Sequence, residues 1–141
     1  MTDRPVIIVG VDNSATSEHA LAWALTAAQR LGATVDAVTT YDETEGETAR
    51  QQAQAVQASL VARAVAVLRD APPVASKVMA GDPVDVLTLL SGSAYMLVMG
   101  RHSTAGLRHS AESSTAERVA RLADCPVTIV PEQASRTSTT R

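Results

Sequence analysis

Hydroxyl and basic side chains gather in a polar segment that follows an apolar run ending at Gly100. Ser113, Ser114 and Thr115 stand where a helix is expected to begin, and Arg101 lies at the start of the segment. The first backbone N–H groups of a helix have no partner inside it, and the helix dipole favours an anion there. The pattern therefore indicates phosphate binding, although the same serines would also serve as simple helix caps.

A phosphate site of this kind needs alternating strands and helices, and the chain has that order. Continuous apolar runs without two-fold alternation are typical of strands buried on both faces, and segments with helical spacing of apolar residues separate them. The expected strands are residues 5–12, 33–42, 74–81, 95–100 and 126–130, and the expected helices run from 14–17 to 31, from 47 to 68, from 83 to 90 and from 114 to 123. This order predicts an α/β fold, an open five-stranded parallel sheet with helices on both faces.

Local residues define how several helices begin and end. Gly32 is placed to end the first helix in a left-handed conformation, and Asp82 followed by Pro83 is typical of a helix start. Ser114 and Glu117 form a capping box for the last helix. The second helix is expected to bury one stripe, made of Ala53, Val56, Leu60, Ala64 and Val67.

The composition fits one small domain of this class. The chain has 141 residues, of which 45% are hydrophobic and 2% aromatic, so the core must be built from aliphatic side chains. We assign residues 1–131 to the domain. Residues 132–141 are polar and are expected to form a disordered tail.

Charge, hydropathy and cysteine content exclude several classes of protein. The net charge is −3 and no basic run occurs, so no nucleic-acid partner is expected. No apolar stretch approaches the roughly 18 residues that span a bilayer, so we expect a cytoplasmic protein with no membrane partner. The single cysteine, Cys125, excludes an internal disulfide and is expected to be a small packing residue.

In open parallel sheets, ligands bind beyond the carboxyl ends of the strands, where the strand order reverses. This rule selects the turn at residues 10–17, the end of the second strand and the polar segment after the fourth. There is no G-x4-G-K-[ST] loop, and no G-x-G-x-x-G follows the first strand. His19, expected to be solvated on a helix surface, and His102 and His109 lack the spacing of metal ligands. No metal site and no catalytic residue is therefore predicted.

Short motifs in a fixed order carry a resemblance to a known family. GVDNS at residues 10–14 follows the first strand, GDP at 81–83 follows the third, VMG ends the fourth at 98–100, and CPV precedes the last at 125–127. With these motifs the chain resembles the universal stress protein family from about Val6 to Val130. The resemblance implies a Rossmann-like fold of the adenine nucleotide alpha hydrolase type and a small regulator of the stress response.

The resemblance also implies ATP, with or without Mg²⁺, as the ligand. In ATP-binding members the loop reads G-x2-G-x9-G-[ST], and Gly100 and Ser114 match its first glycine and its final hydroxyl. Ser103 and Ser113 replace the other two glycines, which allow backbone to approach phosphate closely. A serine adds a Cβ that crowds this approach, but its hydroxyl can donate to a phosphate.

Further site residues carry over by position from the family. Asp12 matches an aspartate that lies near the nucleotide, and Thr40 matches a strand residue that contacts adenine through its backbone. Gly81 and Met99 match residues that line the family's pocket. The complete set of expected nucleotide-binding residues is Gly10, Asp12, Ser14, Thr40, Gly81, Met99, Gly100, Arg101, Ser103, Ser113, Ser114 and Thr115.

The family usually dimerises through its last strand, which implies a homodimer that pairs Val127, Ile129 and Val130 with a second copy. Nucleotide binding with at most slow hydrolysis of ATP is the first hypothesis for the function. Two alternatives remain open. The chain is either a family member that binds no nucleotide and acts as a dimeric interaction module, or a weak phosphatase or hydrolase that uses the same loop.

Overall fold

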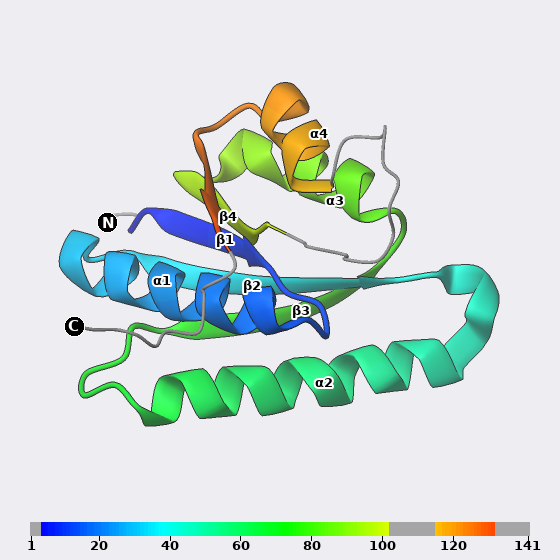
Figure 1. Cartoon of the computed structure of the whole chain (residues 1–141), viewed down its shortest axis with the longest axis horizontal. Helices are drawn as coiled ribbons and strands as arrows, with labels where there is room; N and C mark the ends of the chain where they lie inside the picture. The colour runs from blue at the N-terminus through cyan, green and yellow to red at the C-terminus, as the bar shows by residue number, and fades with distance from the viewer. Residues whose placement is uncertain (1–3, 102–114, 132–141) are drawn as a thin grey trace, which may run out of the picture.

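The computed structural model describes residues 4–101 and 115–131, in which strands and helices alternate (Figure 1). The strands are β1 (Val6–Gly10), β2 (Thr34–Tyr41), β3 (Val74–Ala80), β4 (Met96–Gly100) and β5 (Val127–Val130). The helices are α1 (Ala15–Leu31), α2 (Gly46–Ala66), α3 (Pro83–Leu90) and α4 (Thr115–Leu122), with short 3-10 turns η1 (Glu43–Glu45) and η2 (Ser91–Ser93). Every predicted element is present, with boundaries close to those expected.

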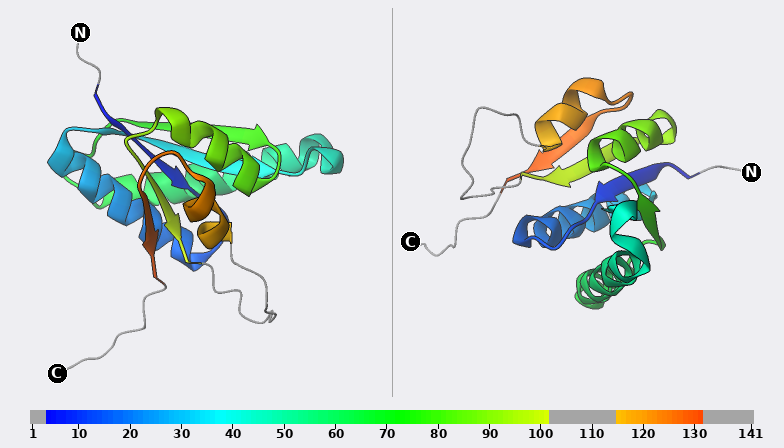
Figure 2. Two further views of the ribbon diagram at one scale, coloured as in Figure 1. Left: turned by 90° about the horizontal axis from the view of Figure 1, so that it is seen from above. Right: turned by 90° about the vertical axis from the view of Figure 1, so that its right-hand side faces the viewer.

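The strands form one parallel sheet in the order β3-β2-β1-β4-β5. Helices α1 and α2 cover one face of the sheet, and α3 and α4 cover the other (Figures 1 and 2). The predicted fold class is confirmed. The chain runs outward from β1 to β3 and then returns to the other side of β1 as β4. The strand order therefore reverses between β1 and β4, at the place where ligands bind in such sheets.

Aliphatic side chains on the two faces of the sheet form two separate cores. Ile7 and Val9 of β1 pack on one face with Leu21 of α1, while Ile8 between them packs on the other face with Leu87 of α3. This division follows from the alternation of side chains along a strand. Both helix layers thus pack against the central strand β1. Helices α1 and α3 both begin at the carboxyl ends of the strands, on opposite faces of the sheet.

The predicted helix ends agree with the structure. Gly32 has a left-handed φ of 69°, and its N–H donates to the carbonyl of Ala28 at the end of α1. Asp82 caps α3, because its Oδ1 accepts the N–H of Val84 at 2.8 Å, and Pro83 occupies the first helical position. Both features depend on neighbouring residues only, which is why the sequence was sufficient to predict them.

Helix α2 departs from its predicted stripe at two positions. Val67 is 79% exposed rather than buried, because the helix ends at Ala66 and Val67 is its C-cap. Gln57 is buried instead, and its Nε2 donates to the carbonyls of Ala37 and Lys77 at 3.0 and 2.9 Å. A buried amide with such partners ties α2 to β2 and β3. None of the described helices combines the length and apolar character that crossing a membrane requires.

Candidate functional site

A cavity of about 170 Å³ lies at the carboxyl ends of β1 and β4, where the strand order reverses. Its described lining consists of Gly10, Val11, Asp12, Ser14, Thr16, Ser17, Val38, Thr40, Pro83, Leu87, Met99, Gly100, Thr115 and Ala116. The structure therefore brings Gly10, Asp12, Ser14, Thr40, Met99, Gly100 and Thr115 of the predicted site together. Ligand pockets usually exceed roughly 300 Å³, so these walls enclose only part of a nucleotide-sized molecule.

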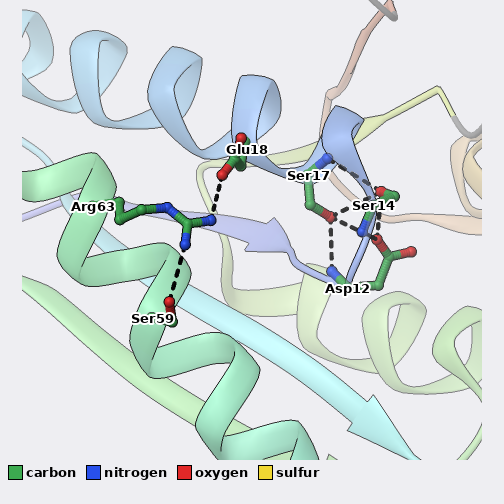
Figure 3. Close-up of polar contacts among 6 residues, drawn as sticks. All are labelled: Asp12, Ser14, Ser17, Glu18, Ser59 and Arg63. Carbon is green, nitrogen blue, oxygen red and sulfur yellow. Dashed lines mark hydrogen bonds and ion pairs between the residues drawn. The ribbon is translucent and has the colours of Figure 1, made fainter.

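The turn between β1 and α1 is held by hydrogen bonds that converge on Asp12 (Figure 3). Its Oδ1 accepts the N–H of Ser14 at 2.9 Å and the hydroxyl of Ser17 at 2.8 Å, and the Ser14 hydroxyl donates to the same oxygen. In return, Ser17 Oγ accepts the N–H of Asp12 at 2.7 Å. The carboxylate thus sits at the amino end of α1, where the helix dipole favours a negative charge.

Two glycines of the cavity have packing roles of their own. A Cβ at Gly100 would lie 2.7 Å from the carbonyl oxygen of Thr16 and 2.8 Å from its Cβ, so the end of β4 rests directly on α1. A Cβ at Gly10 would meet Leu87 Cδ1 at 3.1 Å, which is the end of a flexible side chain on α3. The glycine that the sequence assigns to phosphate binding is therefore also required by the contact between β4 and α1.

The rest of the described lining is mostly apolar. Val38, Leu87 and Met99 are buried core residues that also reach the cavity, and Thr40 lies half-buried at the end of β2. The cavity thus combines a hydroxyl-rich turn with aliphatic side chains. Such a site suits a ligand that has a flat apolar part and a polar part.

The described lining does not include Gly81 or Arg101, which the sequence places in the site. Gly81 follows β3 with a φ of 134°, and its N–H donates to the carbonyl of Tyr41 at 3.0 Å. Arg101 is exposed, and its N–H donates to the carbonyl of Val130 at 2.8 Å. Both residues have structural roles directly after a strand, Gly81 after β3 and Arg101 after β4, and their binding roles stay predictions.

The predicted phosphate segment is described only at its two ends. Ser103, Ser113 and Ser114 lie outside the described residues, so their predicted contacts stay predictions. Thr115 begins α4 and lines the cavity together with Ala116, which is buried. The amino end of α4 therefore borders the cavity, and the positive end of its dipole faces an approaching ligand.

Several lining residues were missed from the sequence. Thr16 and Ser17 carry a signal, because they lie in the selected turn at residues 10–17 and bring hydroxyls to the start of a helix, but the set of expected binding residues does not include them. Leu87 and Ala116 carry no signal that separates a cavity wall from an ordinary core. Only the strand order and the helix layers bring these side chains to the same place.

Two side chains outside the cavity bear on the chemistry. His19 is half-buried rather than solvated, and its Nδ1 is buried without a hydrogen-bond partner in the described part of the chain. The prediction was wrong here because α1 packs over β4 and β5 as well as over the centre of the sheet. Burial, followed by the charge of Asp124, raises the pKa of the Cys125 thiol, which stays protonated at neutral pH. Cys125 is thus a packing residue, as predicted.

A comparison with known protein families decides which kind of domain carries this cavity. The model described as the universal stress protein family matches residues 4–131. The chain belongs to the universal stress protein family. The match includes every described strand and helix, so the resemblance seen in the short sequence motifs is confirmed.

Solved structures of universal stress proteins share this fold. One that was crystallised in complex with cAMP is 27% identical, with a TM-score of 0.75, and the alignment covers 92% of this chain and 98% of that one. A family member from Burkholderia pseudomallei is 27% identical, with a TM-score of 0.68 and coverage of 91% and 96%. A universal stress protein from Archaeoglobus fulgidus in complex with dAMP is 21% identical, with a TM-score of 0.68 and coverage of 92% and 99%. A search of curated proteins found no match.

Proposed function

We propose that this universal stress protein binds an adenine nucleotide in the cavity at the carboxyl ends of β1 and β4. The observation that carries the proposal is the convergence of Gly10, Asp12, Thr40, Met99 and Thr115 on one cavity. The sequence assigns these residues to a nucleotide site, although they come from separate segments of the chain. The relative crystallised with cAMP supports an adenine nucleotide as the ligand.

Each part of the cavity suits one part of a nucleotide. Leu87 and Met99 offer an apolar surface for the base, and the end of β2 at Thr40 offers backbone polar groups to its edge. The amino end of α4 at Thr115 suits a phosphate. ATP is the nucleotide predicted from the sequence. Mg²⁺ would be held by phosphate oxygens and by Asp12, the only carboxylate among the described lining residues.

We propose that the cavity binds its ligand without efficient turnover. A hydroxyl nucleophile needs an adjacent base such as histidine or lysine, and the described lining contains neither. Its serines at positions 14 and 17 instead donate to Asp12, where they hold the turn. The protein would then act in the cytoplasm as a regulator of the stress response, through its nucleotide-bound and nucleotide-free forms.

We also propose a homodimer that forms through β5. This strand lies at the edge of the sheet beside β4, with Val127 and Ile129 half-buried and Val130 buried. An apolar edge strand is stabilised when a second copy pairs with it. Sedimentation at micromolar concentration should give a dimer, and a monomer at that concentration would contradict the proposal.

Nucleotide binding is tested by calorimetric titration with cAMP, AMP and ATP plus Mg²⁺. Thr40→Trp should abolish binding, because the larger side chain fills the cavity at the end of β2. Tyr41→Trp is the matched control, since Tyr41 is also half-buried but is not among the lining residues. Thermal unfolding of both variants checks that they fold.

Three results are informative. Loss of binding in Thr40→Trp with retained binding in Tyr41→Trp would support the cavity as the site. Retained binding in Thr40→Trp would place the nucleotide elsewhere. If none of the three nucleotides binds the unmodified protein at millimolar concentration, the proposed function is wrong.

A further inference from the structure

Helix α1 carries the only tryptophan of the chain, Trp23, and this large apolar side chain is 41% exposed. Tryptophan is enriched at interfaces between proteins, because its ring contributes a large contact area. We infer that Trp23 packs against a second copy of the chain when two β5 strands pair. This inference rests on the homodimer of the proposed function, to which it adds a contact made by a helix.

The contacts of α1 indicate which of its sides faces β5. Glu18 forms an ion pair with Arg63 of α2, so this side of α1 faces α2 (Figure 3). With 3.6 residues per turn, Trp23 lies about 140° around the helix from Glu18 and within about 20° of Thr16. Thr16 rests against Gly100 at the end of β4. Trp23 is therefore on the side of α1 that faces away from α2, toward β4 and β5.

Trp23 is also level with β5 along the direction of the strands. Helix α1 runs opposite to the strands, and Trp23 lies about 10 Å further along it than Thr16. Three strand residues span the same distance, which leads from Gly100 back to Leu97, the partner of Val127 at the start of β5. Since α1 contacts both β4 and β5, Trp23 lies beside the edge of the sheet that β5 forms.

Strand β5 presents backbone groups to a partner at this edge. The carbonyls of Pro126 and Val130 accept N–H groups from the β4 side of the sheet, at 2.9 and 2.8 Å. Because the direction of the backbone groups alternates along a strand, those of Val127 and Ile129 point away from β4. Among the described residues, no strand lies beyond β5. A second copy of β5 can therefore pair with these groups.

The symmetry of such a pair determines which helix approaches the partner. Two identical edge strands that pair antiparallel are related by a two-fold axis perpendicular to the sheet, so both copies of α1 lie on the same face. On this face β5 presents Val130, which packs with α1, and the half-buried Thr128. The β4 strands of the two copies would be about 14 Å apart, with only the two β5 strands between them. Trp23 of each copy borders this strip and packs against the other copy across it.

The experiment uses Trp23 as its own reporter, because no other tryptophan contributes to the emission of the full chain. The protein is diluted from a concentration at which it sediments as a dimer, and tryptophan emission and sedimentation are followed together. Trp23→Ala is then compared with Leu31→Ala by sedimentation. Leu31 is a matched control, because it is 45% exposed on the same helix but lies about 12 Å further along, beyond the start of β5. Far-ultraviolet circular dichroism checks that both variants fold.

The expected result is that the emission moves to longer wavelength as the dimer dissociates. Trp23→Ala should raise the dissociation constant of the dimer by at least about tenfold, and Leu31→Ala by less than about threefold. Emission that stays unchanged on dissociation, or equal effects of the two variants, would overturn the inference and leave the dimer intact. Unchanged emission at short wavelength would show that another part of the same chain covers Trp23. A monomer at micromolar concentration would instead overturn the proposed dimer, and the inference with it.

Discussion

Helices α1 and α3 both begin at the carboxyl ends of the strands, one on each face of the sheet. They flank the cavity in different ways. Helix α1 is fixed by backbone contact, because the end of β4 at Gly100 rests on Thr16 without room for a Cβ. Helix α3 meets β1 through the methyl groups of Leu87, which lie against Gly10. The start of α1 is thus fixed by a close backbone contact, while α3 contacts the sheet through a flexible side chain.

The polar contacts at the starts of the two helices differ in the same sense. Asp12 belongs to a network in which Ser14 and Ser17 donate to one carboxylate oxygen, whereas Asp82 of α3 accepts the N–H of Val84. Asp12 lines the cavity and Asp82 is not among its lining residues. The α1 side of the cavity thus has precise polar contacts, and the α3 side has an adaptable apolar surface. Substitutions on the two sides should therefore have unequal effects.

The largest expected effect comes from Gly100→Ala. The added methyl would lie within 2.8 Å of backbone and side-chain atoms of Thr16, and backbone cannot move aside as a side chain can. We expect a loss of about 2–3 kcal/mol in the free energy of unfolding, measured by chemical denaturation.

Gly10→Ala is the matched control for this substitution on the α3 side. Its methyl would meet Leu87 Cδ1 at 3.1 Å, and a change of rotamer at Leu87 can relieve the contact. A loss of about 1 kcal/mol or less is expected. If the two variants lost the same free energy of unfolding, α1 and α3 would contact the sheet with equal rigidity, and the expected difference between the two helices would be wrong.

The next effect is expected from Ser17→Ala. The substitution removes the acceptor of the Asp12 N–H and one donor to its carboxylate, in a position that is 4% exposed. An unsatisfied backbone group of this kind costs about 1–3 kcal/mol, and we expect about 2 kcal/mol by chemical denaturation. Ser59→Ala, at an exposed position of α2, is a suitable control and should change stability by less than about 0.5 kcal/mol.

A smaller effect is expected from Asp82→Ala on the α3 side. The variant loses the cap that accepts the N–H of Val84, and loss of such a cap typically costs about 1 kcal/mol. Asp82→Ser should recover most of this loss, because serine is also a good N-cap. If Asp82→Ala were more destabilising than Ser17→Ala in the same denaturation assay, the ranking of the two helix starts would be reversed.

Features that depend on residues close together in the chain could be predicted from the sequence. Asp82-Pro83 and Gly32 act through hydrogen bonds to residues nearby in the chain, so the pattern alone located both helix ends. The succession of strands and helices along the chain followed from the apolar runs and from the resemblance to the family. These features need no knowledge of which distant segment packs against which.

Features that depend on contacts between distant segments could not be predicted. Gln57 has no apolar character that would indicate burial, and only the carbonyls of β2 and β3 beneath it explain its position. Leu87 and Ala116 have the residue types of any core, and they become cavity walls because their helices begin where the strand order reverses. The glycine at position 100 was assigned correctly to the site, but its packing against Thr16 is visible only in three dimensions.

The smallest expected effect on stability comes from Asp12→Asn. The amide oxygen can still accept from Ser14 and Ser17, so the turn is preserved, but the favourable interaction of the charge with the helix dipole is lost. A loss of about 0.5 kcal/mol is expected by denaturation without ligand. A loss as large as that of Ser17→Ala in the same assay would show that the charge of the carboxylate, rather than its hydrogen bonds, holds the turn.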